Sequence, residues 1–341
     1  MKREEIAQKR KKAKSQEKLK RRLALAKAEA SNPAAKKKRR EENVPRTLDN
    51  MREYDPSTIS LAGPSSGPSE EQEEIAAEIA ADPFAEYFDT DDPTIPPKTL
   101  ITTSPKATRA TYDFCDELVG VFPGAEFIRR KKGKGFEMGR IAGWAAGRGF
   151  KHLLVVNEDM KKPNAITLVY LPSGPTAYFK LTSVELTKNI FGHARATPHY
   201  PELVLNNFTT RLGHLVGRMF QTTFPPMPEF QGRQVVTLHN QRDFLFFRRH
   251  RYAFRSEDKV ALQEIGPRFT LKLRWVKKNI PAVKNFGEAP KPLEFDIEEA
   301  SENGKEESPK RTVASVVPPR EDEYIWQWKP SIETTRRTFF L

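Results

Sequence analysis

The predicted order of helices and strands occurs twice along the chain, and this repeat limits the fold more than any other feature. In residues 99–200, the strand-like TLITTS precedes a helical run, ATRATYDFCDELVGVF, a short strand-like EFIRR, a second helical run, EMGRIAGWAAGRGF, and three strand-like runs, HLLVVN, AITLVYL and TAYFKLTS. In residues 201–280, PELVLNNF precedes the helical TTRLGHLVGRMFQTTF and the strand-like QVVTLHN, DFLFFRRHRYAF and RFTLKLRWVKK. Apolar residues recur at spacing two in the strands and three or four in the helices. The sequence therefore predicts a mixed α/β domain of two similar halves, each a sheet packed by helices.

Charge and composition divide the rest of the chain into flanking segments. Residues 1–40 carry a net charge of +13, residues 41–98 carry −12, residues 99–280 carry +15 and residues 281–341 carry −3. We expect a basic arm at 1–40, disordered or helical on binding, and an acidic linker rich in Pro and Ser at 41–98. The domain follows at 99–280, then an acidic linker at 281–322 and a tail at 323–341 that docks on the domain through alternating Ile325, Trp326, Gln327 and Trp328.

This uneven charge indicates a polyanionic partner, most simply nucleic acid. The single cysteine excludes an internal disulfide, and six scattered histidines give no metal-ligand spacing, so we expect neither metal nor cofactor. The sequence has no apolar run near 18 residues and no apolar signal region after its first Met, so we expect a soluble intracellular protein without a membrane contact.

The basic arm ends in KKKRR, which is typical of a nuclear import signal formed by Lys36, Lys37, Lys38, Arg39 and Arg40. The alternative is a solvated RNA-binding tail, and one arm can serve both purposes. In the acidic linker, the apolar residues near 73–88 exceed what a linker needs. Phe84, Tyr87 and Phe88 there, with Trp326 and Trp328 in the tail, are candidate protein-docking residues, although the 73–88 element could equally pack on its own domain.

The run DFLFFRRHRYAF begins apolar and becomes basic at Arg248. Side chains alternate along a strand, so in RFTLKLRWVKK Phe269, Leu271, Leu273 and Trp275 share one face, while Lys272 and Arg274 occupy the other. If these two strands pair, we expect one cationic rim that binds phosphates. The alternative places the arginines in ion pairs with the domain's own carboxylates, such as Asp243 or Glu257. HNQRD has the turn-forming residues of a hairpin before this run.

The predicted RNA-binding set combines this rim with basic residues of the neighbouring loops and helices. Its members are Arg129, Arg130, Lys131, Lys132, Arg211, Arg218, Arg242, Arg248, Arg249, Arg251, Lys272, Arg274, Lys277 and Lys278. Tyr252, Phe254 and Trp275 either stack on unpaired bases or pack within the sheet.

Enzyme chemistry has weak support in the sequence. The glycines of GKGFEMG are one residue too widely spaced for a dinucleotide-binding loop, and no phosphate-binding loop with GK[ST] occurs. Asp113 and Glu117 share a helix face as expected of surface carboxylates, and Cys115 lies on the core face of the same helix. His193 and His199 have no matching acid or nucleophile beside them. We therefore predict no catalytic residues.

The chain resembles the Brix-domain family of ribosome-assembly factors. The resemblance rests on the run from Asn206 to Phe254, on LITTSPKATRATYDFCDEL and YLPSGPTAYFKL in the first half, and on DPFAEYF and the tail YIWQWKPSIETTRRTFFL, and it covers roughly residues 84–341. It implies two halves related by a pseudo-twofold axis, each similar to an anticodon-binding domain of aminoacyl-tRNA synthetases.

The resemblance also implies a function. It suggests a non-enzymatic nucleolar factor that binds precursor ribosomal RNA of the large (60S) subunit, together with other assembly factors and ribosomal proteins. The alternative is a protein scaffold of the pre-ribosome, with little direct RNA contact by the folded domain. Neither interpretation needs a small-molecule substrate.

Overall fold

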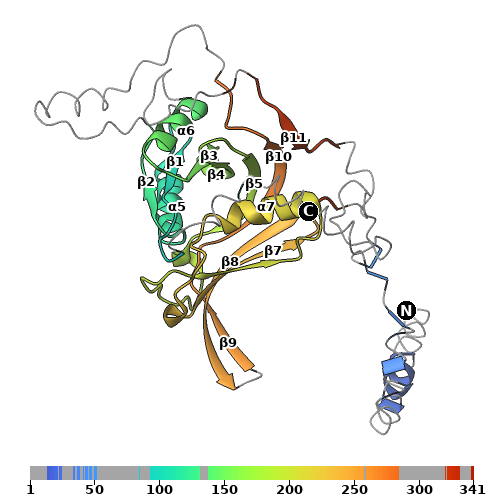
Figure 1. Ribbon diagram of the computed structural model, residues 1–341. Coiled ribbons are helices and arrows are strands. Elements are labelled where there is room, and N and C mark those ends of the chain that lie inside the picture. Colours follow the sequence, from blue (N-terminus) through green and yellow to red (C-terminus); the bar gives the residue numbers. More distant parts are fainter. Residues whose placement is uncertain are drawn as a thin grey trace, which may run out of the picture. The chain divides into compact units, whose positions relative to one another are not determined.

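The computed structural model describes residues 93–130, 137–256, 259–283, 321–330 and 339–341, together with Phe84, Pro319 and scattered residues between 14 and 51. The chain divides into two compact units, Met1–Arg52 and Glu53–Leu341. The described residues of the first unit include exposed helical turns, among them Lys37 and Lys38. The second unit contains the sheet (Figure 1).

The elements of the second unit follow the predicted order. In chain order they are β1 (Thr99–Thr103), α5 (Arg109–Val119), β2 (Ala125–Phe127), α6 (Met138–Gly147), β3 (His152–Asp159), β4 (Lys162–Tyr170), β5 (Thr176–Glu185), the 3-10 turn η1 (Thr187–Asn189), β6 (Glu202–Asn206), α7 (Arg211–Gln221), the 3-10 turn η2 (Phe230–Gly232), β7 (Gln234–Gln241), β8 (Phe244–Ser256), β9 (Lys259–Glu264), β10 (Arg268–Lys277) and β11 (Tyr324–Gln327).

The strands form one sheet in the order β2-β1-β3-β4-β5-β10-β8-β7-β6, with β9 paired to β8 and β11 paired to β10. The two halves meet where β5 pairs antiparallel with β10. In each half, the first strand pairs in parallel with the strand that begins the antiparallel meander, β1 with β3 and β6 with β7. The predicted mixed α/β fold of two similar halves is therefore confirmed.

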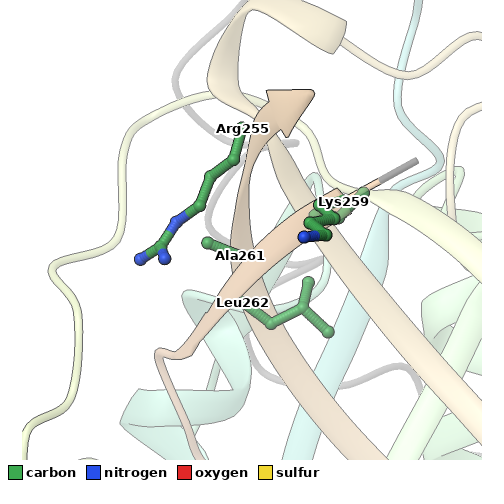
Figure 2. A pocket seen from close by; sticks show the side chains of 5 residues that line it. Arg255, Lys259, Ala261 and Leu262 are labelled. Atoms are coloured by element: carbon green, nitrogen blue, oxygen red, sulfur yellow. The ribbon is translucent and has the colours of Figure 1, made fainter. Parts of the chain in front are cut away.

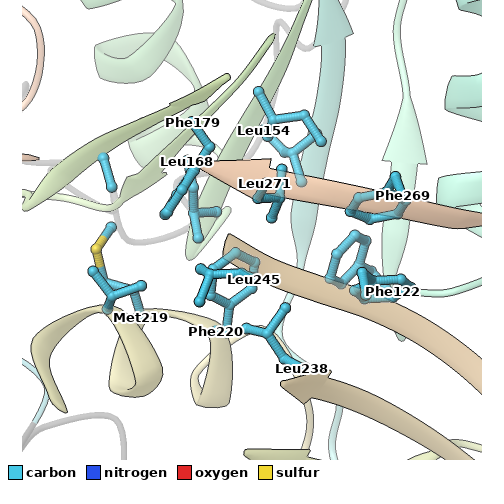
Figure 3. Packing of buried hydrophobic residues seen from close by; sticks show 14 of the residues in the cluster. Phe122, Leu154, Leu168, Phe179, Met219, Phe220, Leu238, Leu245, Phe269 and Leu271 are labelled. Carbon is cyan, nitrogen blue, oxygen red and sulfur yellow. The ribbon is translucent and has the colours of Figure 1, made fainter. Parts of the chain in front are cut away.

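One apolar core joins the halves, because each buried helix contacts strands of the other half. Phe114 of α5 meets Phe269 of β10 edge-on, with ring centroids 5.5 Å apart. Phe220 of α7 lies 5.5 Å from Phe179 of β5. Phe247 and Phe269 stack at 4.3 Å beneath them. Each such ring contributes on the order of 2 kcal/mol by leaving water, so the halves stabilise one another (Figure 3).

The two halves differ in the layer on the other face of the sheet. In the first half α6 covers this face, where Leu153, Val155 and Val169 are almost fully buried with Ala142 and Ala145 of the helix. In the second half, the chain from α7 to β7 contains only the 3-10 turn η2, so no helix corresponds to α6 there. We call this face of β7, β8 and β10 the outer face. The missing helix leaves it without a helical cover within the described residues.

The predicted hairpin between β7 and β8 is also confirmed. Gln241 pairs with Phe244, and the two residues between them, Arg242 and Asp243, have positive φ angles of 56° and 63°. This left-handed pair matches the twist of antiparallel strands.

The end of the chain packs against the domain, as the alternating tail residues indicated. β11 pairs with the end of β10, and Leu341 is 1% exposed within the main core. The Asp243 carboxylate accepts hydrogen bonds from the backbone N–H groups of Phe340 and Leu341, each at 2.9 Å. The Leu341 carbonyl accepts from the Asn240 side-chain amide at 2.9 Å.

Candidate nucleic-acid interface

A strip of side chains on the outer face follows strand β8 from the sheet into a projecting hairpin. Because side chains alternate along a strand, its even-numbered residues lie on one face. We call these residues the outer strip: Phe244, Phe246, Arg248, His250, Tyr252 and Phe254. Contacts at spacing two support this shared face, since the Arg248 guanidinium lies 5.9 Å from the Phe246 ring and the Tyr252 and Phe254 rings are 5.6 Å apart. The strip is therefore aromatic and cationic.

Two lysines extend the positive charge of the outer strip across the sheet. Lys180 of β5 and Lys272 of β10 are direct cross-strand partners, and Lys180 is exposed. The Lys272 ammonium also lies 5.0 Å from the Phe244 ring. The Trp328 ring lies 5.8 Å from the same ammonium, and Lys272 is half-buried. The outer face therefore brings neighbouring lysines together with partly exposed aromatic rings.

Beyond the sheet, β8 continues with β9 as a two-stranded arm, residues 250–256 and 259–264 (Figure 1). One side of this β8–β9 arm is apolar, because Tyr252 pairs with Leu262 and Phe254 with Val260. Phe254 is 68% exposed and Leu262 is 61% exposed. The cations Arg255 and Lys259 flank a shallow hollow of about 540 Å³ there (Figure 2). Sequence reasoning missed β9, whose KVALQE alternates too weakly to indicate a strand.

The single cationic rim expected from β8 and β10 is wrong in its geometry. The strands do pair, from Phe244–Phe247 to Phe269–Lys272, but they run antiparallel. The basic end of β8 and the basic end of β10 therefore point to opposite ends of the strand pair. Arg248 and Arg251 lie toward the arm, whereas Lys277 and Lys278 lie beside β11.

The three arginines of β8 also differ in burial. Arg249 is only 4% exposed and donates to the Gln234 side-chain oxygen at 2.7 Å, so it is not a surface ligand for phosphate. Arg248 is half-buried and donates to the backbone oxygens of Phe247 and Phe269. Burial lowers the pKa of both guanidinium groups, that of Arg249 to about 10. Arg251 is exposed, as predicted for a surface cation.

The basic end of β10 departs from the predicted alternation. The register with β5 shifts between Leu273 and Trp275, so Val276 rather than Trp275 continues the core face. Trp275 instead stacks on Tyr178 at 5.1 Å. Lys277 is buried and forms a 2.6 Å ion pair with Asp322, and Lys278 pairs with Glu323 at 3.6 Å. Lys277 is therefore not a surface cation available to RNA, unlike the prediction.

The remaining members of the predicted set are dispersed. Arg129 is exposed with its guanidinium 4.6 Å from the Tyr112 ring, and burial lowers the pKa of the half-buried Arg130. Arg211 and Arg242 are exposed, and Arg218 is half-buried. The Arg274 guanidinium lies 4.2 Å from the Trp328 ring, which partly covers it. Lys131 and Lys132 lie outside the described residues.

The protein-docking candidates have different surroundings. Phe84 is fully buried with its ring 5.0 Å from Tyr170, so the structure places it in the domain's own core rather than on a partner. Trp326 packs on Phe340 at 5.6 Å and Trp328 on Arg274, so both contact this domain. Tyr87, Phe88, Lys36, Arg39 and Arg40 lie outside the described residues.

The residues considered for catalysis have structural roles. Burial raises the pKa of the Cys115 thiol to about 12, which keeps it protonated. The Asp113 carboxylate pairs with Lys188 at 3.3 Å, and both Glu117 oxygens accept from the Thr187 N–H at 3.0 Å. Among the described residues, no group of three or more His, Cys, Asp and Glu side chains could hold a metal ion. Within the same part of the chain, no helix is long and apolar enough to cross a membrane.

Sequence reasoning also missed Lys180, and it did not separate the two faces of the apolar run Phe244–Phe247. Only Leu245 and Phe247 of that run face the core. The period of two within FLFFRR was the available signal, since alternate residues must face opposite sides of a strand.

Comparison with known proteins identifies the family of this chain. The Brix domain family model matches residues 104–275. "Brix domain-containing protein C4F8.04" of Schizosaccharomyces pombe is 47% identical over 78% of this chain and 85% of that protein. "Ribosome production factor 1" of Saccharomyces cerevisiae is 41% identical over 82% of this chain and 89% of that protein. The crystal structure of a probable ribosomal biogenesis protein from Aeropyrum pernix K1 aligns with a TM-score of 0.40 at 17% identity, covering 52% of this chain and 96% of that one. On the family match and the two relatives, this chain belongs to the Brix-domain family, in the group of ribosome production factor 1.

Proposed function

We propose that this chain is a non-enzymatic ribosome-biogenesis factor that binds precursor ribosomal RNA during assembly of the large subunit, in the nucleus and nucleolus. Its family membership supports the biogenesis role, because relatives of similar length are named ribosome production factor 1. The net charge of +13 supports an RNA partner. Other pre-ribosomal proteins are its further partners.

The outer face is the observation that carries this proposal. Lys180 and Lys272 are direct cross-strand neighbours, of which Lys180 is exposed and Lys272 is half-buried. Phe244 is 37% exposed beside them, and Phe254 is 68% exposed farther along the strip. Cations in this arrangement contact phosphates, and exposed rings stack on unpaired bases whatever their sequence. The face thus suits single-stranded or looped RNA without sequence-specific readout.

The test measures RNA affinity against salt concentration for a variant with Lys180→Gln and Lys272→Gln. Two lost phosphate contacts should reduce the slope of log affinity against log salt by about 1.4, at about 0.7 per contact on a single strand. The matched control is Lys161→Gln with Lys162→Gln, because these exposed lysines at the β3–β4 turn remove the same charge away from the outer face. An equal fall in slope for both variants would contradict a role of this particular face.

A scaffold function remains the second candidate, and the apolar side of the β8–β9 arm favours it. Exposed Leu262 and Phe254 suit a protein surface as well as they suit bases. Ultraviolet crosslinking of the full chain to RNA separates the two functions. Crosslinked peptides from β8 or β10 support RNA binding by the domain, whereas crosslinks confined to residues 1–40 support the scaffold.

A further inference from the structure

Arg249 is a buried cation for which the described residues supply no counter-ion. The side chain is 4% exposed. Its guanidinium donates a hydrogen bond to the neutral side-chain oxygen of Gln234 at 2.7 Å. The Nε atom is buried without a hydrogen-bond partner. Burial alone lowers the pKa of Arg249 to about 10, and no described carboxylate offsets this. A buried unpaired charge is strongly unfavourable, so its retention needs an explanation.

A network of hydrogen bonds fixes the position of this cation. The Gln234 side-chain amide donates to the Thr197 carbonyl at 2.9 Å and to the His199 carbonyl at 3.2 Å. These bonds leave the Gln234 oxygen to accept from Arg249. Thr197 and His199 belong to the segment that connects the two halves. The connecting segment therefore holds Arg249 in one orientation.

Arg249 also forms part of the wall of a cavity of about 330 Å³. We call it the linker cavity, because residues 193–196 of the connecting segment line it. The other walls come from the end of α5, from Thr187 and from the turn between β9 and β10; the lining residues are Glu117, Gly120, Thr187, His193, Ala194, Arg195, Ala196, Arg249, Ile265, Gly266 and Pro267. Most of the lining is apolar, and Arg195 adds a second cation.

We propose that the linker cavity binds a carboxylate carried on a short apolar stem, such as an acidic side chain of a partner protein, with Arg249 as the cation that receives it. Ala194, Ala196 and Ile265 would contact the stem, because a volume of about 330 Å³ is much larger than the anion alone. Glu117 in the same wall disfavours a doubly charged phosphate more than a singly charged carboxylate. This site lies apart from the outer strip and does not depend on RNA binding.

The experiment uses the full chain, labelled for nuclear magnetic resonance, with sodium butyrate as the probe at constant ionic strength. Butyramide has nearly the same shape without the charge, and inorganic phosphate has the charge without the stem. Butyrate should shift the backbone amide resonances of Ala194, Ala196 and Ile265 and bind at least about tenfold more tightly than butyramide, as expected for one charge-assisted hydrogen bond.

Two variants test the two parts of the site. Arg249→Met removes the charge with similar volume, and Ala196→Trp fills the exposed rim of the cavity while leaving Arg249 intact. Each should weaken butyrate binding at least about tenfold. Arg255→Met, which removes a charge in the β8–β9 arm, should bind like the natural sequence. If Arg249→Met does not fold, Ala196→Trp decides alone.

Three outcomes would overturn the proposal. Equal binding of butyrate and butyramide would show that the cavity does not recognise charge. Tighter binding of phosphate would replace the carboxylate with a phosphate ligand. Unchanged butyrate binding by Ala196→Trp would place the probe elsewhere.

Discussion

Neighbouring residues of β8 have opposite surroundings because the side chains of a strand alternate. Arg249 is buried and lines the linker cavity, while Arg248 lies on the outer strip. Arg251 is on the same face of the strand as Arg249, but it is exposed because it lies in the β8–β9 arm. A run of basic residues therefore does not form one surface. Its members differ in the face that each occupies and in whether the position lies over the core or in the arm.

His152 provides a pH-dependent test of burial at a single residue. It is 0% exposed, its Nε2 atom lies 2.9 Å from the Thr222 hydroxyl, and burial lowers its pKa to about 3. Below pH about 6.5 the unfolded chain binds a proton that the folded protein excludes. Above about pH 6.5 His152 is neutral in both states and does not make stability depend on pH. As pH falls from about 6.5 toward 3, it lowers the free energy of unfolding by about 1.4 kcal/mol per pH unit.

Urea unfolding between pH 4 and 7 measures this dependence. His152→Gln keeps a polar partner for the Thr222 hydroxyl but does not titrate, so its stability should fall less steeply on acidification. Carboxylates titrate in both proteins and cancel in the comparison. Parallel stability curves for the two proteins would show that His152 does not contribute.

Phe254 tests the stacking role of the outer strip. At 68% exposure, its replacement by Ser should change the free energy of unfolding by no more than about 0.5 kcal/mol. If the ring stacks on a base, affinity for single-stranded RNA should fall by about 1–3 kcal/mol. Phe230→Ser is the control, since Phe230 is 62% exposed in η2. Equal RNA affinity for both variants would argue against stacking by Phe254.

At the scale of elements, local pattern determined most of what could be predicted. The helical spacing of Tyr112, Cys115 and Leu118 identified α5, and Asn240 with Asp243 identified the hairpin turn. The local pattern could not predict which strands, distant in the sequence, pair with one another. The antiparallel contact of β8 with β10, the shifted register at Trp275 and the burial of Phe84 against Tyr170 all depend on the assembled fold.

The tail supplies a prediction at the same scale. Leu341 is 1% exposed and packs in the main core, whereas Ile325 on β11 is 50% exposed. Leu341→Ala should therefore lower the free energy of unfolding by about 2–5 kcal/mol, and Ile325→Ala by no more than about 0.5 kcal/mol. Urea unfolding of both variants measures the difference. A loss below about 1 kcal/mol for Leu341→Ala would contradict the anchoring of the tail.

At the scale of the whole molecule, the basic arm and the folded domain are separable. Residues 1–40 carry a net charge of +13, and the division between the compact units falls at Arg52 and Glu53. Deletion of 1–40 should leave the melting temperature of the domain unchanged. It should also weaken RNA binding with a smaller salt dependence, and reduce accumulation in the nucleus.

Calorimetry, RNA titration at several salt concentrations and fluorescence microscopy measure these three effects. A truncated protein that still accumulates fully in the nucleus would rule out the import role of Lys36–Arg40. Unchanged salt dependence would rule out the arm's contribution to RNA binding.

The pairing of β10 with β11 also has a practical consequence for engineering. The Ala282 N–H donates to Asp322 at 3.0 Å, and the Lys278 N–H donates to the Glu323 carbonyl at 2.9 Å, so the chain leaves and rejoins the domain at one place. The cost of closing such a loop grows only with the logarithm of its length, by about 0.6 kcal/mol per doubling. We therefore expect insertions or deletions between Val283 and Pro319 to change the free energy of unfolding of the sheet only slightly.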